Sequence, residues 1–194
     1  MDQNLPLYEP GPTRADALQN RQLLLQTARR LFEELGVEQV SMTAVAQEAG
    51  VGKGTLYRHF ENKAALCQAL LDEEQRDLQT RTMHRLATLD DALDNLRWFL
   101  VEVVNYVERN RAFLCVQVPN EEVMLLGHPA HLWWRQTIYK LLQRINPLGD
   151  LSYMADVLYA MLDVHVLRFQ RSTLGYNQQR IVAGLEETLF KLLR

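Results

Sequence analysis

The sequence predicts an all-α protein, and three observations lead to this fold class. Apolar residues recur at intervals of three and four along nearly every long segment, which is the spacing of one helix face. No segment clearly shows the alternation of apolar and polar residues that is typical of a strand. Glycine, proline and asparagine fall between the periodic segments, where helices begin and end. We expect an N-terminal three-helix domain followed by a C-terminal helical bundle.

The composition is that of an ordinary globular protein. Of the 194 residues, 47% are apolar and 23% are charged, and the formal net charge is -3. Any basic surface for nucleic acid must therefore be local. No apolar run reaches the roughly 20 residues that a membrane span needs, and the N-terminus lacks a signal-peptide pattern. We expect a cytoplasmic protein in which Cys67 and Cys115 are free thiols.

The N-terminal part begins with a proline-rich stretch that predicts a flexible arm over residues 1–12. An amphipathic helix from Arg14 to Leu35 follows, and Gly36 ends it. The polar face of this helix is basic. Arg14, at the end of the arm, could reach a minor groove, or it could simply begin an ordered helix. The basic residues of this helix are Arg14, Arg21, Arg29 and Arg30.

Two short helices come next. Ser41 is expected to cap the first, which runs through Ala49 and is closed by Gly50. The second spans about Lys53–Phe60. Two short helices joined by a tight glycine-containing turn, after a longer helix, form a helix-turn-helix layout.

The rest of the chain is predicted to be helical as well. The first expected elements are a helix capped by Asn62 over about Lys63–Leu86, a helix capped by Asp90 or Asp91 that runs to about Arg109, and a short helix opened by Asn110. Asn120 opens another helix, which is interrupted at Gly127 and Pro129 before it resumes toward Ile145. A turn over Asn146–Asp150, a very apolar helix over about Leu151–Arg171 and a last helix over Asn177–Leu193 complete the chain.

The second short helix has two contrasting faces. At 100° per residue, Leu56 and Phe60 share one face, while Thr55 and Arg58 fall on the opposite crest. Such a helix suits a DNA major groove, where crest residues reach base edges and flanking residues reach phosphates. The alternative is a solvated helix with a polar outer face. The two flanks carry Tyr57 and His59.

The segment VSMTAVAQEAGVGKGTLYRHFENKAAL, residues 40–66, closely resembles the DNA-binding domain of the TetR family of bacterial transcriptional regulators. The resemblance implies that Arg58, at a variable position, helps to set sequence preference, and that Lys63 contacts phosphate. It also implies phosphate contacts from Ser41 and Thr43. The positions that match operator-contacting residues are Lys53, Gly54, Thr55, Tyr57 and His59. Gly52 departs from the family pattern, since many members have serine there.

The resemblance further implies that residues 13–64 bind DNA and that residues 65–194 form a regulatory and dimerisation domain. The helix over Leu151–Arg171 is apolar on more than one face, which suits a four-helix bundle across a two-fold axis. A fully internal helix in a monomer is the alternative reading. The residues expected at the dimer interface are Leu158, Met161, Leu162, Ile181, Leu185 and Leu189.

An effector pocket for a small hydrophobic molecule is expected in the same domain, lined by aromatic and a few polar side chains. Each candidate could equally be plain core. No cofactor or metal is expected, because His128 and His131 alone are too few ligands. The candidates are Trp98, Tyr106, Phe113, Met124, His128, Trp134, His165 and Phe169.

These observations favour a homodimeric repressor that binds a palindromic operator and is released by a small-molecule effector. A DNA-binding regulator without such an effector stays open as an alternative. An enzyme on a helical bundle is disfavoured, because none of the five histidines has a glutamate three residues before it and no catalytic motif is present.

Overall fold

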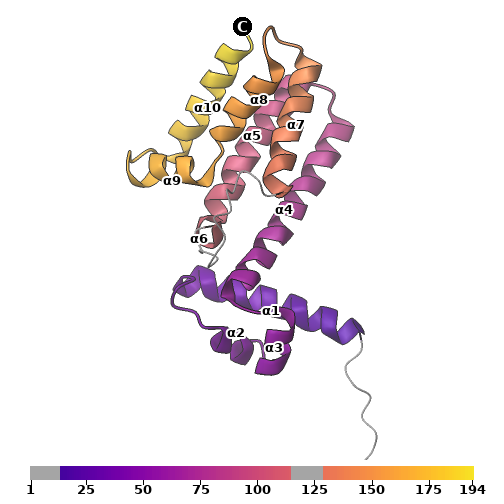
Figure 1. Cartoon of the computed structure of the whole chain (residues 1–194), viewed down its shortest axis with the longest axis vertical. Coiled ribbons are helices and arrows are strands. Elements are labelled where there is room, and N and C mark those ends of the chain that lie inside the picture. Colours follow the sequence, from indigo (N-terminus) through magenta and orange to yellow (C-terminus); the bar gives the residue numbers. More distant parts are fainter. Residues whose placement is uncertain (1–13, 115–128) are drawn as a thin grey trace, which may run out of the picture. The chain divides into compact units, whose positions relative to one another are not determined.

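The computed structural model describes residues 14–114 and 129–194, and all regular elements within these ranges are helices (Figure 1), which confirms the all-α prediction. The chain divides into two compact units, Met1–Leu70 and Leu71–Arg194. The boundary predicted from the sequence, at residues 64–65, lies in the same helix, α4. The helices are α1 (Arg14–Leu35), α2 (Met42–Glu48), α3 (Lys53–His59), α4 (Lys63–Thr88), α5 (Ala92–Arg109), α6 (Arg111–Leu114), α7 (Pro129–Ile145), α8 (Leu151–Ala160), α9 (Val164–Ser172) and α10 (Gln178–Leu192).

The core of the N-terminal unit is formed by the apolar faces of α1, α2 and α3, which contact one another. Leu24, Val45 and Leu56 are fully buried, one from each helix. Their burial follows the three-and-four spacing of the sequence. On the outside, the guanidinium of Arg30 lies 2.5 Å from the Glu48 carboxylate and so links α1 to α2.

Local hydrogen bonds and glycines mark where the helices of this unit begin and end, at the positions that the sequence predicts. The hydroxyl of Ser41 accepts a hydrogen bond from the backbone N–H of Ala44 at 3.1 Å and caps α2. The side-chain oxygen of Asn62 accepts from the N–H three residues on, at 2.8 Å, where α4 begins. Gly36 and Gly50 follow α1 and α2 with φ angles of 85° and 64°. Glycine occupies this left-handed region without the steric cost that a side chain brings.

In the C-terminal unit, α5 contacts α7 and α10, and α7 contacts α8 (Figure 1). The apolar stripe that the sequence predicts on α5 is its buried face. Polar bonds tie α4 to α5 beside this core: Arg81 pairs with Glu102, and Arg85 pairs with Asp94. The buried residues of the α5 stripe include Leu96, Phe99, Leu100, Val103 and Val107.

The single apolar helix expected over Leu151–Arg171 is wrong. The chain forms two helices there, α8 and α9, separated at 161–163. The carboxylate of Asp163 accepts hydrogen bonds from the backbone N–H groups of His165 and Val166, at 2.8 and 3.3 Å. Asp163 therefore caps a new helix inside the apolar run. The apolar spacing continues across this cap, which is why periodicity alone gives one helix.

Asp91 rather than Asp90 caps α5, since its carboxylate accepts from the N–H of Asp94 at 2.9 Å. The predicted turn before α8 is present, with Asn146 and Gly149 at φ angles of 53° and 110°. The first part of the helix expected to open at Asn120 lies outside the described residues, which resume at Pro129, and its continuation toward Ile145 is α7. In the described part of the chain, no helix combines the length and apolarity that crossing a membrane requires.

Candidate nucleic-acid interface

A tight turn joins α2 to α3 in the N-terminal unit (Figure 1). Gly50 donates its N–H to the carbonyl of Gln47 at 3.1 Å, and Val51 donates to the carbonyl of Ala46 at 2.9 Å. These bonds end α2 as the chain turns toward α3. The two short helices and this turn form the helix-turn-helix layout that the sequence predicts.

The outer face of α3 is a polar crest over an apolar anchor. Leu56 is fully buried and Phe60 is 3% exposed, so these two side chains hold α3 in the unit. Tyr57 and Arg58 are exposed, and Thr55 is half-buried. The anchor therefore lies where 100° per residue puts it, whereas of the two predicted crest residues Arg58 is exposed and Thr55 only half-buried. Lys53 and Gly54 are also exposed, at the start of the helix.

His59 lies at the edge of this surface with one buried nitrogen. Its Nε2 has no hydrogen-bond partner among the described residues. Desolvation by burial lowers the pKa of this imidazole below its ordinary value, and the positive charges of Arg58 and Arg21 lower it further. The ring lies 6.2 Å from that of Phe60, centroid to centroid. The structure therefore favours the neutral imidazole near pH 7.

A pH dependence follows from this pKa shift. Because the pKa of His59 is lowered from 6.5 in the folded chain, the unfolded chain binds more protons in the window just below that pH. The free energy of unfolding should therefore fall as the pH drops through this window, and should be unaffected by His59 above it. In a His59→Gln variant this part of the dependence should disappear. Urea unfolding of both proteins at pH about 7.5 and about 5.5 measures the difference, and equal pH dependence would contradict it.

Lys63 was expected to contact phosphate, but its amine is engaged within the unit. The Nζ atom donates to the carbonyl of Val37 at 2.8 Å and to that of Glu38 at 3.4 Å. These carbonyls belong to the turn between α1 and α2. Lys63 thus secures this turn against the start of α4, a role that the sequence pattern did not indicate. Ser41 and Thr43 lie at the start of α2, exposed and half-buried respectively.

The effector-pocket candidates do not gather at one place among the described residues. Tyr106, Phe113 and Trp134 are buried in the C-terminal unit. Trp98 is half-buried, with the guanidinium of Arg85 5.0 Å from its ring centroid. The remaining candidates are His165 and Phe169, which are exposed on α9, and Met124 and His128, which lie outside the residues whose side chains are described.

Two buried polar residues near the aromatic core were missed by the sequence analysis. Gln75 accepts a hydrogen bond from the indole Nε1 of Trp134 at 3.0 Å, and its own Nε2 has no partner in the described part of the chain. Asn110 is fully buried, and its Oδ1 likewise has no hydrogen-bond partner among the described residues. Trp134 packs edge-on against Tyr106, with 5.4 Å between centroids. Gln75 is separated from Trp134 by 59 positions, so no local pattern could have paired them.

The predicted dimer contacts lie mainly inside a single chain. Met161 is half-buried, and the other five are buried in the C-terminal unit. Their side chains therefore pack mainly against their own chain. The five buried residues are Leu158, Leu162, Ile181, Leu185 and Leu189.

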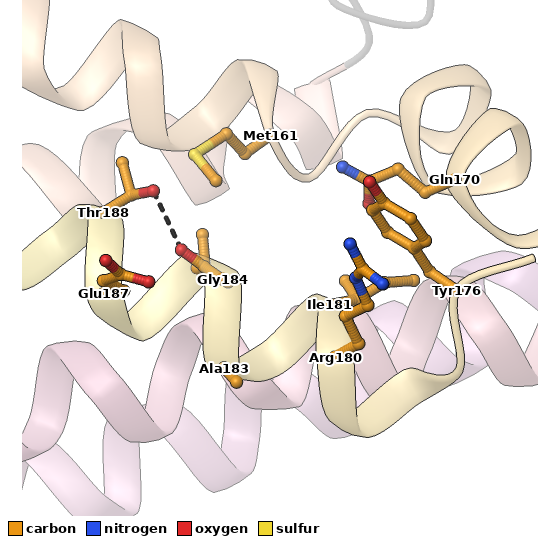
Figure 2. Close-up of a pocket in the computed structure, with 10 residues that line it drawn as sticks. Met161, Gln170, Tyr176, Arg180, Ile181, Ala183, Gly184, Glu187 and Thr188 are labelled. Carbon is orange, nitrogen blue, oxygen red and sulfur yellow. Dashed lines mark hydrogen bonds between the residues drawn. The ribbon is translucent and has the colours of Figure 1, made fainter. Parts of the chain in front are cut away.

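A hollow of about 440 Å³ lies along α10, in a place that the sequence analysis did not indicate (Figure 2). Met161 and Gln170 border it on one side and α10 on the other. None of the predicted pocket residues that the structure describes lines it, whereas three of the predicted dimer contacts do, namely Met161, Ile181 and Leu185.

The fold and the α3 surface define a helix-turn-helix DNA-binding protein with a helical second unit. A family model described as "Bacterial regulatory proteins, tetR family" matches residues 24–70. An HTH-type transcriptional regulator of Staphylococcus aureus is 38% identical over 161 residues, which are 81% of this chain and 85% of that protein. The chain belongs to the TetR family of bacterial transcriptional regulators, which confirms the resemblance seen in residues 40–66. It is a regulator and not an enzyme.

Solved structures share the fold over nearly the whole chain. NalD, described as the secondary repressor of a multidrug efflux pump in Pseudomonas aeruginosa, aligns with a TM-score of 0.65 at 23% identity, covering 92% of this chain and 98% of its own. A Saccharomonospora viridis protein in complex with choline aligns with a TM-score of 0.67 at 22% identity, covering 88% and 95%.

Proposed function

We propose that the protein is a homodimeric repressor that binds a palindromic operator and is released by a small hydrophobic effector in its C-terminal unit. The observation that carries the proposal is the exposed polar crest of α3, which Leu56 and Phe60 anchor from beneath. That NalD is a repressor of similar fold supports repression. In this proposal residues 13–64 bind DNA in the cytoplasm, and residues 65–194 form the regulatory and dimerisation domain.

On the operator, α3 enters the major groove. Arg58 and Thr55 contact base edges from the crest, since these side chains point away from the anchor. Lys53, Tyr57 and His59 contact the phosphates on either side, and Gly54 allows close approach of the backbone. Further phosphate contacts come from the start of α2, from Ser41 and Thr43. Lys63 contributes by securing the α1–α2 turn, because its amine already bonds two carbonyls.

Two copies of α3, related by a two-fold axis, would enter successive major grooves about 34 Å apart. The operator would then be a palindrome with half-sites one helical turn apart. The effector acts by favouring an arrangement of the dimer in which this spacing is lost.

A matched pair of substitutions tests which side chain contacts phosphate and which recognises the base sequence. Lys53→Ala should weaken binding to operator and to random DNA by the same factor, and should lower the slope of log affinity against log salt by about one per subunit. Arg58→Ala should weaken operator binding by about 5- to 150-fold and leave random-DNA binding less affected. Both affinities are measured by fluorescence anisotropy over a salt series. An Arg58→Ala variant with unchanged base preference would contradict the readout role.

The effector part of the proposal has support in the aromatic core of the C-terminal unit. Among the described residues, the Gln75 amide has a donor and the Asn110 amide an acceptor without a partner. Hydrogen bonds and ring packing link both residues to Tyr106 and Trp134. Buried polar groups without partners are costly, so a ligand that satisfies them is stabilised. The choline complex shows a protein of similar fold that holds a small molecule.

Thermal melting of the protein with a panel of small hydrophobic compounds tests this part. A true effector at 100 times its Kd should raise the stability by about 2.7 kcal/mol and should weaken operator binding. If no compound shifts the melting temperature while the operator is bound, the regulator without a small-molecule effector becomes the better hypothesis.

A further inference from the structure

Two amide side chains in the core of the C-terminal unit each keep one hydrogen-bonding atom without a partner. Gln75 is 6% exposed and Asn110 is fully buried. Among the described residues, the Nε2 donor of Gln75 and the Oδ1 acceptor of Asn110 bond to nothing. The other buried polar side chains of this unit do have partners, so the two amides are exceptions. These other side chains are Thr82, Asn95 and Thr137.

The bonds that the two amides do make fix which end of each is unpaired. The Oε1 atom of Gln75 accepts from the indole Nε1 of Trp134 at 3.0 Å, and an indole N–H can only donate. The Nδ2 atom of Asn110 donates to the carbonyl of Tyr106 at 2.9 Å, and a carbonyl can only accept. Turning either amide over would place two donors or two acceptors together. The core therefore offers one donor and one acceptor of known identity.

Both amides adjoin the same pair of aromatic side chains. Trp134 packs edge-on against Tyr106, with 5.4 Å between the ring centroids. The hydroxyl of Tyr106 donates to the carbonyl of Leu71 at 3.4 Å, and Leu71 lies one helical turn before Gln75 on α4. The backbone carbonyl of Tyr106 is the group to which Asn110 donates. The two rings thus supply an apolar surface beside the unpaired donor and the unpaired acceptor.

The charged groups near this core already have partners of opposite sign. The buried polar side chains of the described part of this unit are all uncharged. Glu74 lies 3.6 Å from the guanidinium of Arg109, and Glu108 lies 3.4 Å from that of Arg171. Burying a further charge without a counter-charge is costly. A charged ligand in this core would therefore lose its hydration without gaining an ion pair.

The hydroxyl of Tyr106 shows that the surroundings disfavour an anion in particular. Burial raises the pKa of this phenol above its ordinary value, and the negative charges of Glu74 and Asp72 raise it further. The phenol is therefore uncharged near pH 7. The same burial and the same negative charges would act against a carboxylate bound beside the ring.

The two unpaired atoms together select among chemical groups. A carboxylate only accepts hydrogen bonds, so it could satisfy Gln75 and not Asn110. An ammonium only donates, so it could satisfy Asn110 and not Gln75. A carboxamide, a lactam or a hydroxyl both accepts and donates, and none of these groups carries a charge. Only groups of this third kind can pair with both amides.

We propose that the effector is an uncharged molecule whose apolar body packs on Tyr106 and Trp134 and which carries a carboxamide, a lactam or a hydroxyl group. Its oxygen accepts from Nε2 of Gln75, and its N–H or O–H donates to Oδ1 of Asn110. This inference rests on the proposed function, which places an effector in the C-terminal unit, and assigns the chemical class of that effector. Gln75 and Asn110 are then the residues that determine effector specificity.

Matched probes test the chemical class on the full chain. Three compounds share a naphthalene ring and carry a carboxamide, a carboxylate or a methylammonium group, and isothermal titration calorimetry gives the Kd of each. At pH about 7 the carboxamide should bind with a Kd about 10- to 100-fold lower than either ion, because each ion leaves one amide unpaired and buries a charge. An octyl series with the same three groups repeats the comparison on a flexible body.

Two variants test the assigned residues. Gln75→Met removes the donor, so it should raise the Kd of the carboxamide by about 10-fold and leave that of the methylammonium probe unchanged. Asn110→Leu removes the acceptor, so it should weaken the carboxamide similarly and leave the carboxylate probe unchanged. Gln143→Met makes the first of these changes at an exposed position of α7 and should alter none of the three Kd values. If a variant does not fold, the ranking of the probes on the wild type still decides.

The outcomes separate this inference from the proposed function. An ion that binds as tightly as the carboxamide overturns the inference, and so do folded variants that leave carboxamide binding unaffected. If no probe binds while other compounds of the hydrophobic panel shift the melting temperature, the assigned class is wrong and the effector proposal stands. If no probe binds and no compound of the panel shifts the melting temperature, the effector proposal fails as well.

Discussion

Leu56→Ala should destabilise the N-terminal unit by about 2 to 5 kcal/mol and should abolish operator binding, although Leu56 does not lie on the crest that meets DNA. Leu56 is fully buried, so its removal leaves a cavity beneath α3. A seven-residue helix cannot hold its conformation without this packing. Urea unfolding gives the change in free energy, and hydrogen exchange in residues 42–60 shows which unit is affected.

Leu18→Ala is the matched control for this substitution. It makes the same chemical change in the same unit, but Leu18 is 62% exposed, and its removal should alter the stability by no more than about 0.5 kcal/mol. A Leu56→Ala protein that unfolds like the wild type, or that binds the operator normally, would show that α3 does not depend on its anchor.

Trp134→Ala should destabilise the C-terminal unit by about 3 to 5 kcal/mol. The side chain is fully buried and packs edge-on against Tyr106, and its indole N–H donates to Gln75. Trp134→Phe keeps most of the apolar volume but removes the donor, which leaves the amide of Gln75 without its partner. We expect this smaller change to cost about 1 to 3 kcal/mol, measured by the loss of far-ultraviolet circular dichroism in urea.

A double-mutant cycle separates the hydrogen bond from the packing. In the Trp134→Phe background, Gln75→Met removes the unsatisfied amide and should recover part of the lost stability. In the wild-type background the same substitution should destabilise, because the indole N–H then loses the acceptor that Gln75 provides. Additive effects in the cycle would mean that the two side chains do not depend on each other.

Local chemistry explains why much of the fold could be predicted from the sequence. Ser41 and Asn62 cap helices with hydrogen bonds to the backbone three residues on. Gly36 and Gly50 adopt positive φ angles, which glycine allows because it has no side chain. The anchor and crest of α3 also follow from the period of one short helix. All of these features depend on neighbours in the sequence.

Features that depend on distant parts of the chain could not be predicted in the same way. Lys63 bonds to carbonyls 25 and 26 residues away, and Gln75 bonds to a tryptophan 59 residues away. The apolar run over Leu151–Arg171 satisfies a helical period, yet Asp163 divides it, and the faces that were taken for a dimer contact are needed inside the chain. Periodicity identifies an apolar face, but it does not tell which neighbour covers that face.

The bonds of Lys63 have a consequence for the chemistry of the amine itself. The Nζ atom of Lys63 is held by two carbonyls and its side chain is half-buried, which restricts the approach of an acylating reagent. Lys53, ten positions earlier, is exposed at the start of α3. The two lysines look alike in the sequence, as basic residues of one motif. In the folded protein they differ as nucleophiles: Lys53 is the one open to covalent modification, and Lys63 is protected by the turn that it holds.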